Sequence, residues 1–128
     1  MRVAGLGFRA AADLASLQDA LRLALEGANG GAIDALVTEA AKSREKVFQE
    51  LAGLMGVPGL GVTQEDLQKM ITPTQSQRIQ DRFGTGSLAE AAALAAAGPH
   101  ARLVAPRVVS GDGKATAAIA QNFEETQT

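Results

Sequence analysis

The sequence predicts a small α/β layered domain, with a mixed, mostly parallel sheet, a C-terminal β-hairpin and helices on both faces. Apolar runs of strand length alternate with segments of helical period through most of the chain, which is typical of layered α/β domains. Two closing apolar runs flank a Ser-Gly-Asp-Gly turn, which predicts the antiparallel hairpin. The 128 residues suffice for one hydrophobic core, so we expect a single domain over residues 1–121 and a flexible tail over residues 122–128.

The first half of the chain alternates strands and helices. Asp13 and Ser16 are both candidates for the N-cap of the first helix, and Gly27 ends it. Gly56 ends the second helix, and Pro58 favours an edge position or a strand start for the segment that follows. The predicted elements of this half are strands at residues 2–8, 32–38 and 57–62 and helices at residues 14–25 and 43–55.

The second half carries further helices before the hairpin. Thr63 caps a short helix, and residues 75–83 are mostly polar, which predicts a loop or another short helix. Ser87 and Glu90 have the spacing of a capping box at the start of an alanine-rich helix, which Gly98 ends. The hairpin strands are predicted at residues 102–109 and 114–120.

Composition and charge exclude several classes of function. The formal net charge of −2 gives no broad attraction to nucleic acid or to an anionic membrane. Cysteine is absent, which excludes thiol nucleophiles, disulfides and thiolate metal sites. No apolar stretch reaches the roughly 20 residues that cross a bilayer, and the N-terminus lacks a signal-peptide core. We therefore expect a cytoplasmic protein with no metal, no cofactor and neither nucleic acid nor membrane as partner.

The opening segment reads Gly-x-Gly-x-x-Ala, the pattern of a dinucleotide-binding turn. Such a site needs a helix that begins inside the glycine turn and an acidic residue at the tip of the second strand. Here the helix cap lies several residues beyond Gly7, and Asp34 comes before or within the second strand, so a nucleotide site is disfavoured. Two interpretations remain: a tight turn in which Gly5 and Gly7 adopt positive φ, or close approach of a ligand beside Arg9.

Four sequence blocks, in order and across nearly the whole chain, resemble one family. They are Gly-Leu-Gly-Phe-Arg at 5–9, Thr-Glu-Ala-Ala-Lys-Ser-Arg-Glu at 38–45, Gly-Thr-Gly-Ser-Leu-Ala-Glu-Ala-Ala-Ala-Leu at 84–94 and Ala-Thr-Ala-Ala-Ile-Ala at 115–120. Together they are similar to the cobalamin biosynthesis protein CobE and the C-terminal domain of CbiG. Phe8 stands where many members have Cys, so a thiol there is not essential in this chain. Pro106 lies near a position where CbiG-like members have Lys.

The resemblance implies a role in corrin ring synthesis. It implies that the protein binds a late intermediate such as hydrogenobyrinic acid, as a carrier or accessory. The alternative is a CbiG-like hydrolase that opens a corrinoid lactone with release of a two-carbon fragment. The expected partners are the corrinoid and other cobalamin-pathway enzymes. The alanine-rich helix would pack as readily against a second copy of the chain as against its own sheet, which leaves a homo-oligomer open.

Corrin intermediates are edged with acetate and propionate carboxylates, so a binder needs backbone N–H groups and cations at its rim. We expect the two Gly-x-Gly segments to meet at one edge of the sheet, where ligands bind in open α/β folds. The predicted ligand-binding residues are Gly5, Gly7, Arg9, Lys42, Glu45, Gly84, Gly86, Ser87 and Glu90, with Arg107 or Lys114 as further cations.

Several of these residues have plainer structural interpretations. Glu90 is favoured as the capping-box partner of Ser87 over a general base. Lys42 and Glu45 have the spacing of a surface ion pair at a helix start. His100 follows a Gly-Pro turn and is favoured as solvent-exposed over a metal ligand. No catalytic residue is assigned, and a lactone-opening reaction would have only Glu45, Glu90 or His100 to activate water.

Overall fold

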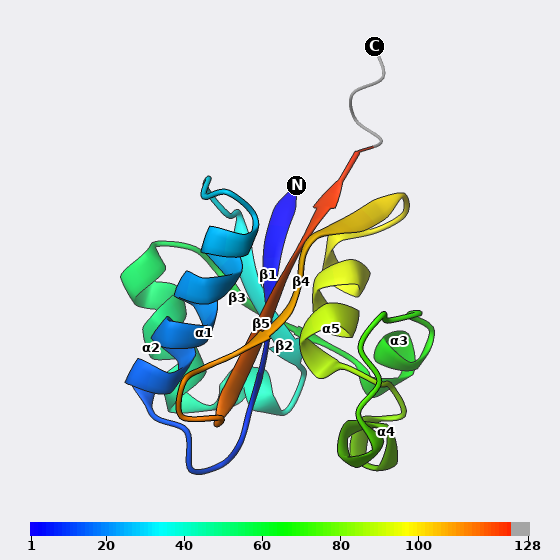
Figure 1. Cartoon of the computed structure of the whole chain (residues 1–128), viewed down its shortest axis with the longest axis horizontal. Coiled ribbons are helices and arrows are strands. Elements are labelled where there is room, and N and C mark those ends of the chain that lie inside the picture. The colour runs from blue at the N-terminus through cyan, green and yellow to red at the C-terminus, as the bar shows by residue number, and fades with distance from the viewer. Residues whose placement is uncertain (124–128) are drawn as a thin grey trace.

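The computed structural model describes residues 1–123 as a five-stranded sheet between two helical layers (Figure 1). Residues 124–128 of the predicted tail lie outside the described residues, and Asn122 is the last residue of the final strand. In chain order the elements are β1 (Arg2–Phe8), α1 (Leu14–Gly27), β2 (Ala35–Glu39), the 3₁₀ turn η1 (Lys42–Arg44), α2 (Lys46–Met55), β3 (Gly59–Val62), α3 (Gln64–Gln68), α4 (Gln77–Phe83), α5 (Leu88–Ala97), β4 (Ala101–Val109) and β5 (Ala115–Asn122).

The sheet is mixed, as the sequence predicts. Its strand order is β3-β2-β1-β5-β4, with β1, β2 and β3 parallel to one another and β5 antiparallel to both of its neighbours. Four of the five strands therefore run in the same direction. The edge where β1 ends is also the edge where the β4–β5 hairpin turns, since Phe8 pairs with Ala115. This edge brings the ends of distant segments together.

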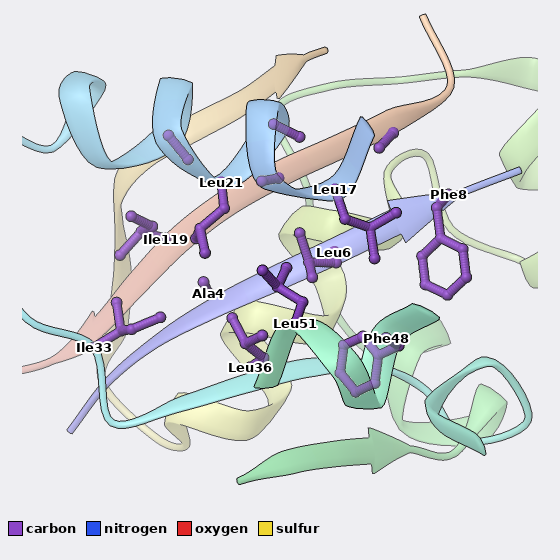
Figure 2. Packing of buried hydrophobic residues seen from close by; sticks show 14 of the residues in the cluster. Ala4, Leu6, Phe8, Leu17, Leu21, Ile33, Leu36, Phe48, Leu51 and Ile119 are labelled. Atoms are coloured by element: carbon purple, nitrogen blue, oxygen red, sulfur yellow. The ribbon is translucent and has the colours of Figure 1, made fainter. Parts of the chain in front are cut away.

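Helices α1 and α2 cover one face of the sheet with large apolar side chains (Figure 2). Alternate residues of β1 point to this face, because side chains along a strand alternate between its two sides. The Phe8 ring stacks on Phe48 of α2, with ring centroids 6.3 Å apart. The larger side chains of this cluster are Leu6, Phe8, Leu17, Leu21, Ile33, Leu36, Phe48, Leu51 and Ile119.

Helix α5 covers the other face and packs directly on the backbone of β1. A Cβ added to Gly5 would lie 2.0 Å from the Ala89 carbonyl oxygen and 2.8 Å from the Ala93 nitrogen. Only glycine leaves room for the helix at this distance. The interpretation of Gly5 and Gly7 as a tight turn is therefore wrong: both lie within β1, and neither has a positive φ.

The alanines of α5 are buried within their own chain. Ala89, Ala91, Ala92 and Ala93 are each 0% exposed. Ala89 lies against Gly5, and the other three belong to one apolar cluster with Val3, Val37 and Ala120 of the sheet. Their short side chains let the helix approach the strands closely. The alanine-rich face of α5 is thus covered by the sheet of its own chain.

Local capping signals hold at three helix starts. Asp13 caps α1 and forms a reciprocal capping box with Ser16, Thr63 caps α3, and Ser87 caps α5. The polar segment at residues 75–83 forms the short helix α4, which ends at Gly84 with φ of 75°. In the described part of the chain, no helix has both the length and the apolarity needed to cross a membrane.

Candidate functional site: a cationic cavity at the edge of the sheet

A cavity of about 60 Å³ opens where β1 ends and β5 begins. Segments from both halves of the chain form its walls, since η1, α4, the first residue of α5 and the β4–β5 hairpin all contribute. Its lining residues are Gly7, Phe8, Arg9, Lys42, Arg78, Ile79, Arg82, Phe83, Leu88, Arg107, Gly113, Lys114, Ala115 and Thr116. The structure therefore brings five sequence-predicted residues to one site, namely Gly7, Arg9, Lys42, Arg107 and Lys114.

Every charged residue that lines this cavity is a cation. There are six of them, and the lining includes no Asp or Glu; they are Arg9, Lys42, Arg78, Arg82, Arg107 and Lys114. Within residues 1–123, none of the six forms an ion pair with a carboxylate, because the ion pairs of this region are made by Arg22 and Lys69. Converging like charges repel, so an anion at this position relieves the repulsion.

Lys42 is the buried member of the set, at 8% exposure. Its Nζ donates a hydrogen bond of 2.7 Å to the Phe8 carbonyl oxygen and lies 4.6 Å from the centroid of the Phe8 ring. Burial lowers the pKa of the Lys42 ammonium below its usual 10.5, and the charge of Arg82 lowers it further, against smaller opposite effects of Glu45 and Glu39. The charged form of Lys42 is therefore less favourable here than in water, and an anion bound nearby would offset this effect.

The expectation of a surface ion pair between Lys42 and Glu45 is wrong. Glu45 is exposed at the N-cap of α2, makes no side-chain capping bond there and does not line the cavity. The Lys42 side chain instead turns inward to the Phe8 carbonyl. The Lys42 ammonium is therefore paired with a buried carbonyl and not with a surface carboxylate.

Arg78 and Arg82 are the cavity residues that the sequence analysis did not single out. They lie four residues apart on α4, which places their side chains on the same side of that helix. Both are exposed, and Arg82 also lies over the ring of Phe83, 5.0 Å from its centroid. The sequence shows two arginines with helical spacing in a polar segment. It contains no local pattern to indicate that this segment packs near the end of β1.

The second Gly-x-Gly segment has a packing role beside the cavity. A Cβ on Gly86 would lie 2.5 Å from Gln75 Oε1 and 2.6 Å from the Thr74 carbonyl oxygen. A Cβ on Gly84 would meet Gln68 in the same way. Neither glycine lines the cavity, so their backbone is covered by the chain itself rather than open as a cradle. Helix α5 covers Gly5, and Thr74 and Gln75 cover Gly86, so the two Gly-x-Gly segments do not form one open cleft.

Glu90 joins three segments together from a fully buried position. Its carboxylate accepts hydrogen bonds from the Thr74 backbone N–H at 2.9 Å, the Thr74 hydroxyl at 3.0 Å and the Arg107 backbone N–H at 2.9 Å. Ser87 caps α5 by accepting from the Glu90 N–H. The reciprocal half of the predicted capping box is therefore not formed, because Glu90 reaches donors from a loop and from β4 instead.

The hairpin turn that carries Lys114 is fastened to the start of α1. Asp112 accepts hydrogen bonds from the hydroxyls of Ser110 and Ser16, at 2.6 and 2.5 Å, and from the Lys114 backbone N–H. These bonds, led by the one from Ser110, lower the pKa of Asp112 to about 2. The Gly111 N–H also donates to Asp19 of α1. The rim of the cavity is thus held in place by hydrogen bonds to α1.

None of the predicted acid–base candidates lines the cavity. His100 follows α5 and precedes β4, at the end of the sheet where Ala101 pairs with Asn122. It is exposed, has φ of 67°, and does not line the cavity. Within residues 1–123, no three His, Asp or Glu side chains gather as metal ligands. The cavity itself presents hydrogen-bond donors and positive charge, which suits binding of an anionic group.

Comparison with known proteins places the chain in a family. The family model described as "Cobalamin synthesis G C-terminus" matches residues 2–120. The crystal structure of CobE, a protein from the cobalamin (vitamin B12) biosynthetic pathway, gives a TM-score of 0.86 at 26% sequence identity, covering 96% of this chain and 91% of that one.

A second solved structure, of the cobalamin biosynthesis protein chiG from Agrobacterium tumefaciens str. C58, gives a TM-score of 0.74 at 37% identity. It covers 96% of this chain and 99% of that one. No significant match is found among curated proteins. The family match, the shared fold and the four sequence blocks agree, and the chain belongs to the CobE/CbiG C-terminal family of cobalamin biosynthesis proteins.

Proposed function

We propose that this protein binds a late corrin intermediate such as hydrogenobyrinic acid, as a carrier or accessory in corrin ring synthesis. The cationic cavity at the end of β1 is the proposed contact site. The observation that carries the proposal is the convergence of six cations on one cavity whose lining includes no carboxylate. An acid-edged macrocycle is a ligand with the complementary charge.

The cavity supplies the parts that such a ligand needs. Exposed Arg9 and Lys114 extend positive charge onto the rim, while the buried Lys42 provides a donor inside. Phe83 and Leu88 add apolar surface beside these cations. The arginines and lysines would bind a carboxylate in different ways, because a guanidinium forms two parallel hydrogen bonds with it and an ammonium acts as a point charge.

Binding a corrinoid requires fewer functional groups in the cavity than hydrolysing one does. Opening a lactone requires a group that activates water within hydrogen-bond reach of the substrate. None of the three candidates for that role, Glu45, Glu90 and His100, lines the cavity. Glu90 is further engaged by three hydrogen-bond donors. These observations favour the binding role over the hydrolase.

An absorbance titration of the purified protein with hydrogenobyrinic acid tests the proposal. We expect a saturable spectral change and recovery of the macrocycle with unchanged mass. A lactone-bearing corrinoid is also incubated with the protein and analysed by mass spectrometry. Loss of a two-carbon fragment would favour the hydrolase. Absence of any saturable change up to the solubility limit of the macrocycle contradicts corrinoid binding altogether.

A further inference from the structure

We propose that the cavity distinguishes a free carboxylate from an amide at the end of a corrinoid side chain, with the buried Lys42 ammonium as the discriminating donor. This inference rests on the proposed function and adds a chemical selection to it. Binding of the macrocycle alone would not require it, because a flat ring can be held by apolar contacts and rim charges.

The size of the cavity indicates which part of the ligand enters. Its volume is about 60 Å³. A cavity needs about 10–15 Å³ of such volume to hold one water molecule, so this cavity accommodates a group the size of a carboxylate and is far too small for a macrocycle. The ring then lies outside, over the exposed rim cations, and one acetate or propionate arm extends inward.

The interior offers donors and almost no acceptors. Ammonium and guanidinium groups donate hydrogen bonds and cannot accept them. The Phe8 carbonyl at the inner wall already accepts from Lys42, and the Gly7 carbonyl faces the Thr116 hydroxyl at 3.4 Å. A carboxylate has acceptor sites alone and matches this wall, whereas the NH₂ group of an amide would find only the Thr116 hydroxyl as an acceptor among the lining side chains.

Charge adds to the same preference. Lys42 lies at 8% exposure, and no carboxylate within residues 1–123 pairs with its ammonium. The acids that act on it through space, Glu39 and Glu45, oppose an effect of burial and of Arg82 and Arg78 that is larger overall. A bound carboxylate supplies the missing counter-charge, and a neutral amide does not.

This selection gives the protein a place in a reaction sequence. Amide formation at a side chain removes the carboxylate that the cavity accepts. The protein therefore binds a macrocycle whose inserted arm is still a free acid, and a reaction that converts this arm to an amide would come after binding. Conversion of the arm would also weaken binding and release the product.

Matched titrations test the inference. Hydrogenobyrinic acid and the same macrocycle with its side chains converted to primary amides are titrated at one salt concentration. We expect the acid to bind at least about tenfold more tightly, because hydrogen bonds to an ionised group are roughly twice as strong as neutral ones. Lys42→Met, which keeps the apolar stem, should lose the part of this preference that the inserted arm supplies while the part due to the rim cations stays, and exposed Lys69→Met should keep all of it.

The outcomes separate the inference from the proposed function. Equal affinity of the wild-type protein for acid and amide overturns the carboxylate selection while corrinoid binding stands. A full preference retained by folded Lys42→Met overturns the role of Lys42. Binding of neither macrocycle overturns the proposed function itself. Should Lys42→Met fail to give a cooperative melt, Lys42→Gln provides the same comparison with a polar side chain.

Discussion

On the face of the sheet covered by α1 and α2, nine of the sixteen buried residues of the apolar cluster are leucine, isoleucine or phenylalanine, whereas under α5 only three of twelve are, and six are alanine. One strand serves both. Leu6 and Phe8 of β1 point to the first face, and Gly5 and Gly7 allow α5 to lie against the second. The first face gains stability from buried area, and the second from close approach of backbones.

Both packing modes meet at the cavity. Phe8 comes from the face with large side chains and presents its carbonyl and ring to Lys42. Gly7 comes from the closely packed face, where a Cβ would lie 2.7 Å from Thr116 Oγ1 and 3.6 Å from Leu88 Cβ. The two faces should therefore respond oppositely to added and removed atoms, while the binding site depends on both.

Adding a methyl group to the closely packed face is expected to give the largest effect. Gly5→Ala places a Cβ against the Ala89 carbonyl, which belongs to the helix backbone and has no rotamer to change. We expect a loss of more than about 4 kcal/mol in the free energy of unfolding, at the extreme of single substitutions.

Gly53→Ala is the matched control in chemical denaturation. A Cβ there meets nothing within 4 Å, at an exposed position in the last turn of α2. It should stabilise the protein by roughly 0.5–1 kcal/mol, as expected for a glycine inside a helix. A Gly5→Ala variant as stable as the wild type would refute the close contact between α5 and β1.

Removing atoms should cost most on the other face. Leu36→Ala deletes a fully buried side chain of β2 that packs with α1 and α2. We expect a loss of about 2–5 kcal/mol, from lost burial and the cavity left behind. Truncation under α5, as in Ala92→Gly, should cost only about 1 kcal/mol. Equal costs measured by urea unfolding would remove the distinction between the faces.

Breaking the polar link of the alanine face should have an intermediate effect. Glu90→Gln places an NH₂ group among three donors that a carboxylate accepted. We expect a loss of about 2 kcal/mol, the cost of leaving a buried donor unpaired. Glu50→Gln, at an exposed position of α2, should change stability by less than about 0.5 kcal/mol. Identical unfolding curves for the two variants would contradict the link through Glu90.

The smallest effect is expected at the hairpin turn, and it should depend on pH. The pKa of Asp112 is lowered from 3.8 to about 2 in the folded protein, so its contribution to stability is present above pH 3.8 and is lost as the pH falls through about 2. Asp112→Asn should therefore be less stable than the wild type at pH 5, with the difference shrinking toward pH 2. A difference that stays constant over this range in thermal melts would contradict the assignment.

Much of the fold could be predicted because its signals are local. Apolar periodicity located the strands and helices, and the side chains of Asp13, Thr63 and Ser87 marked helix starts that the structure confirms. The Ser-Gly-Asp-Gly turn marked the hairpin. Segment 75–83 remained ambiguous, since α4 is short and carries few apolar residues.

The site was only partly predictable, because it depends on contacts between distant segments. Arg9 and Lys42 were identified by motif, but their distance to Arg78 and Arg82 depends on how α4 folds back. Gly5 and Gly86 looked like open turns, since a sequence does not show which helix or loop covers a glycine. Glu90 fitted a capping box locally, and its actual donors come from residues 16 and 17 positions away.

The claim that cations of this cavity hold the corrinoid is tested most directly by removing two exposed ones. Hydrogenobyrinic acid is titrated by calorimetry into the wild type, into Arg78→Gln/Arg82→Gln, and into Arg22→Gln/Lys69→Gln, which changes the net charge equally away from the cavity. We expect at least about tenfold weaker binding for the first double variant and little change for the second. Equal affinity of both folded variants would contradict the account.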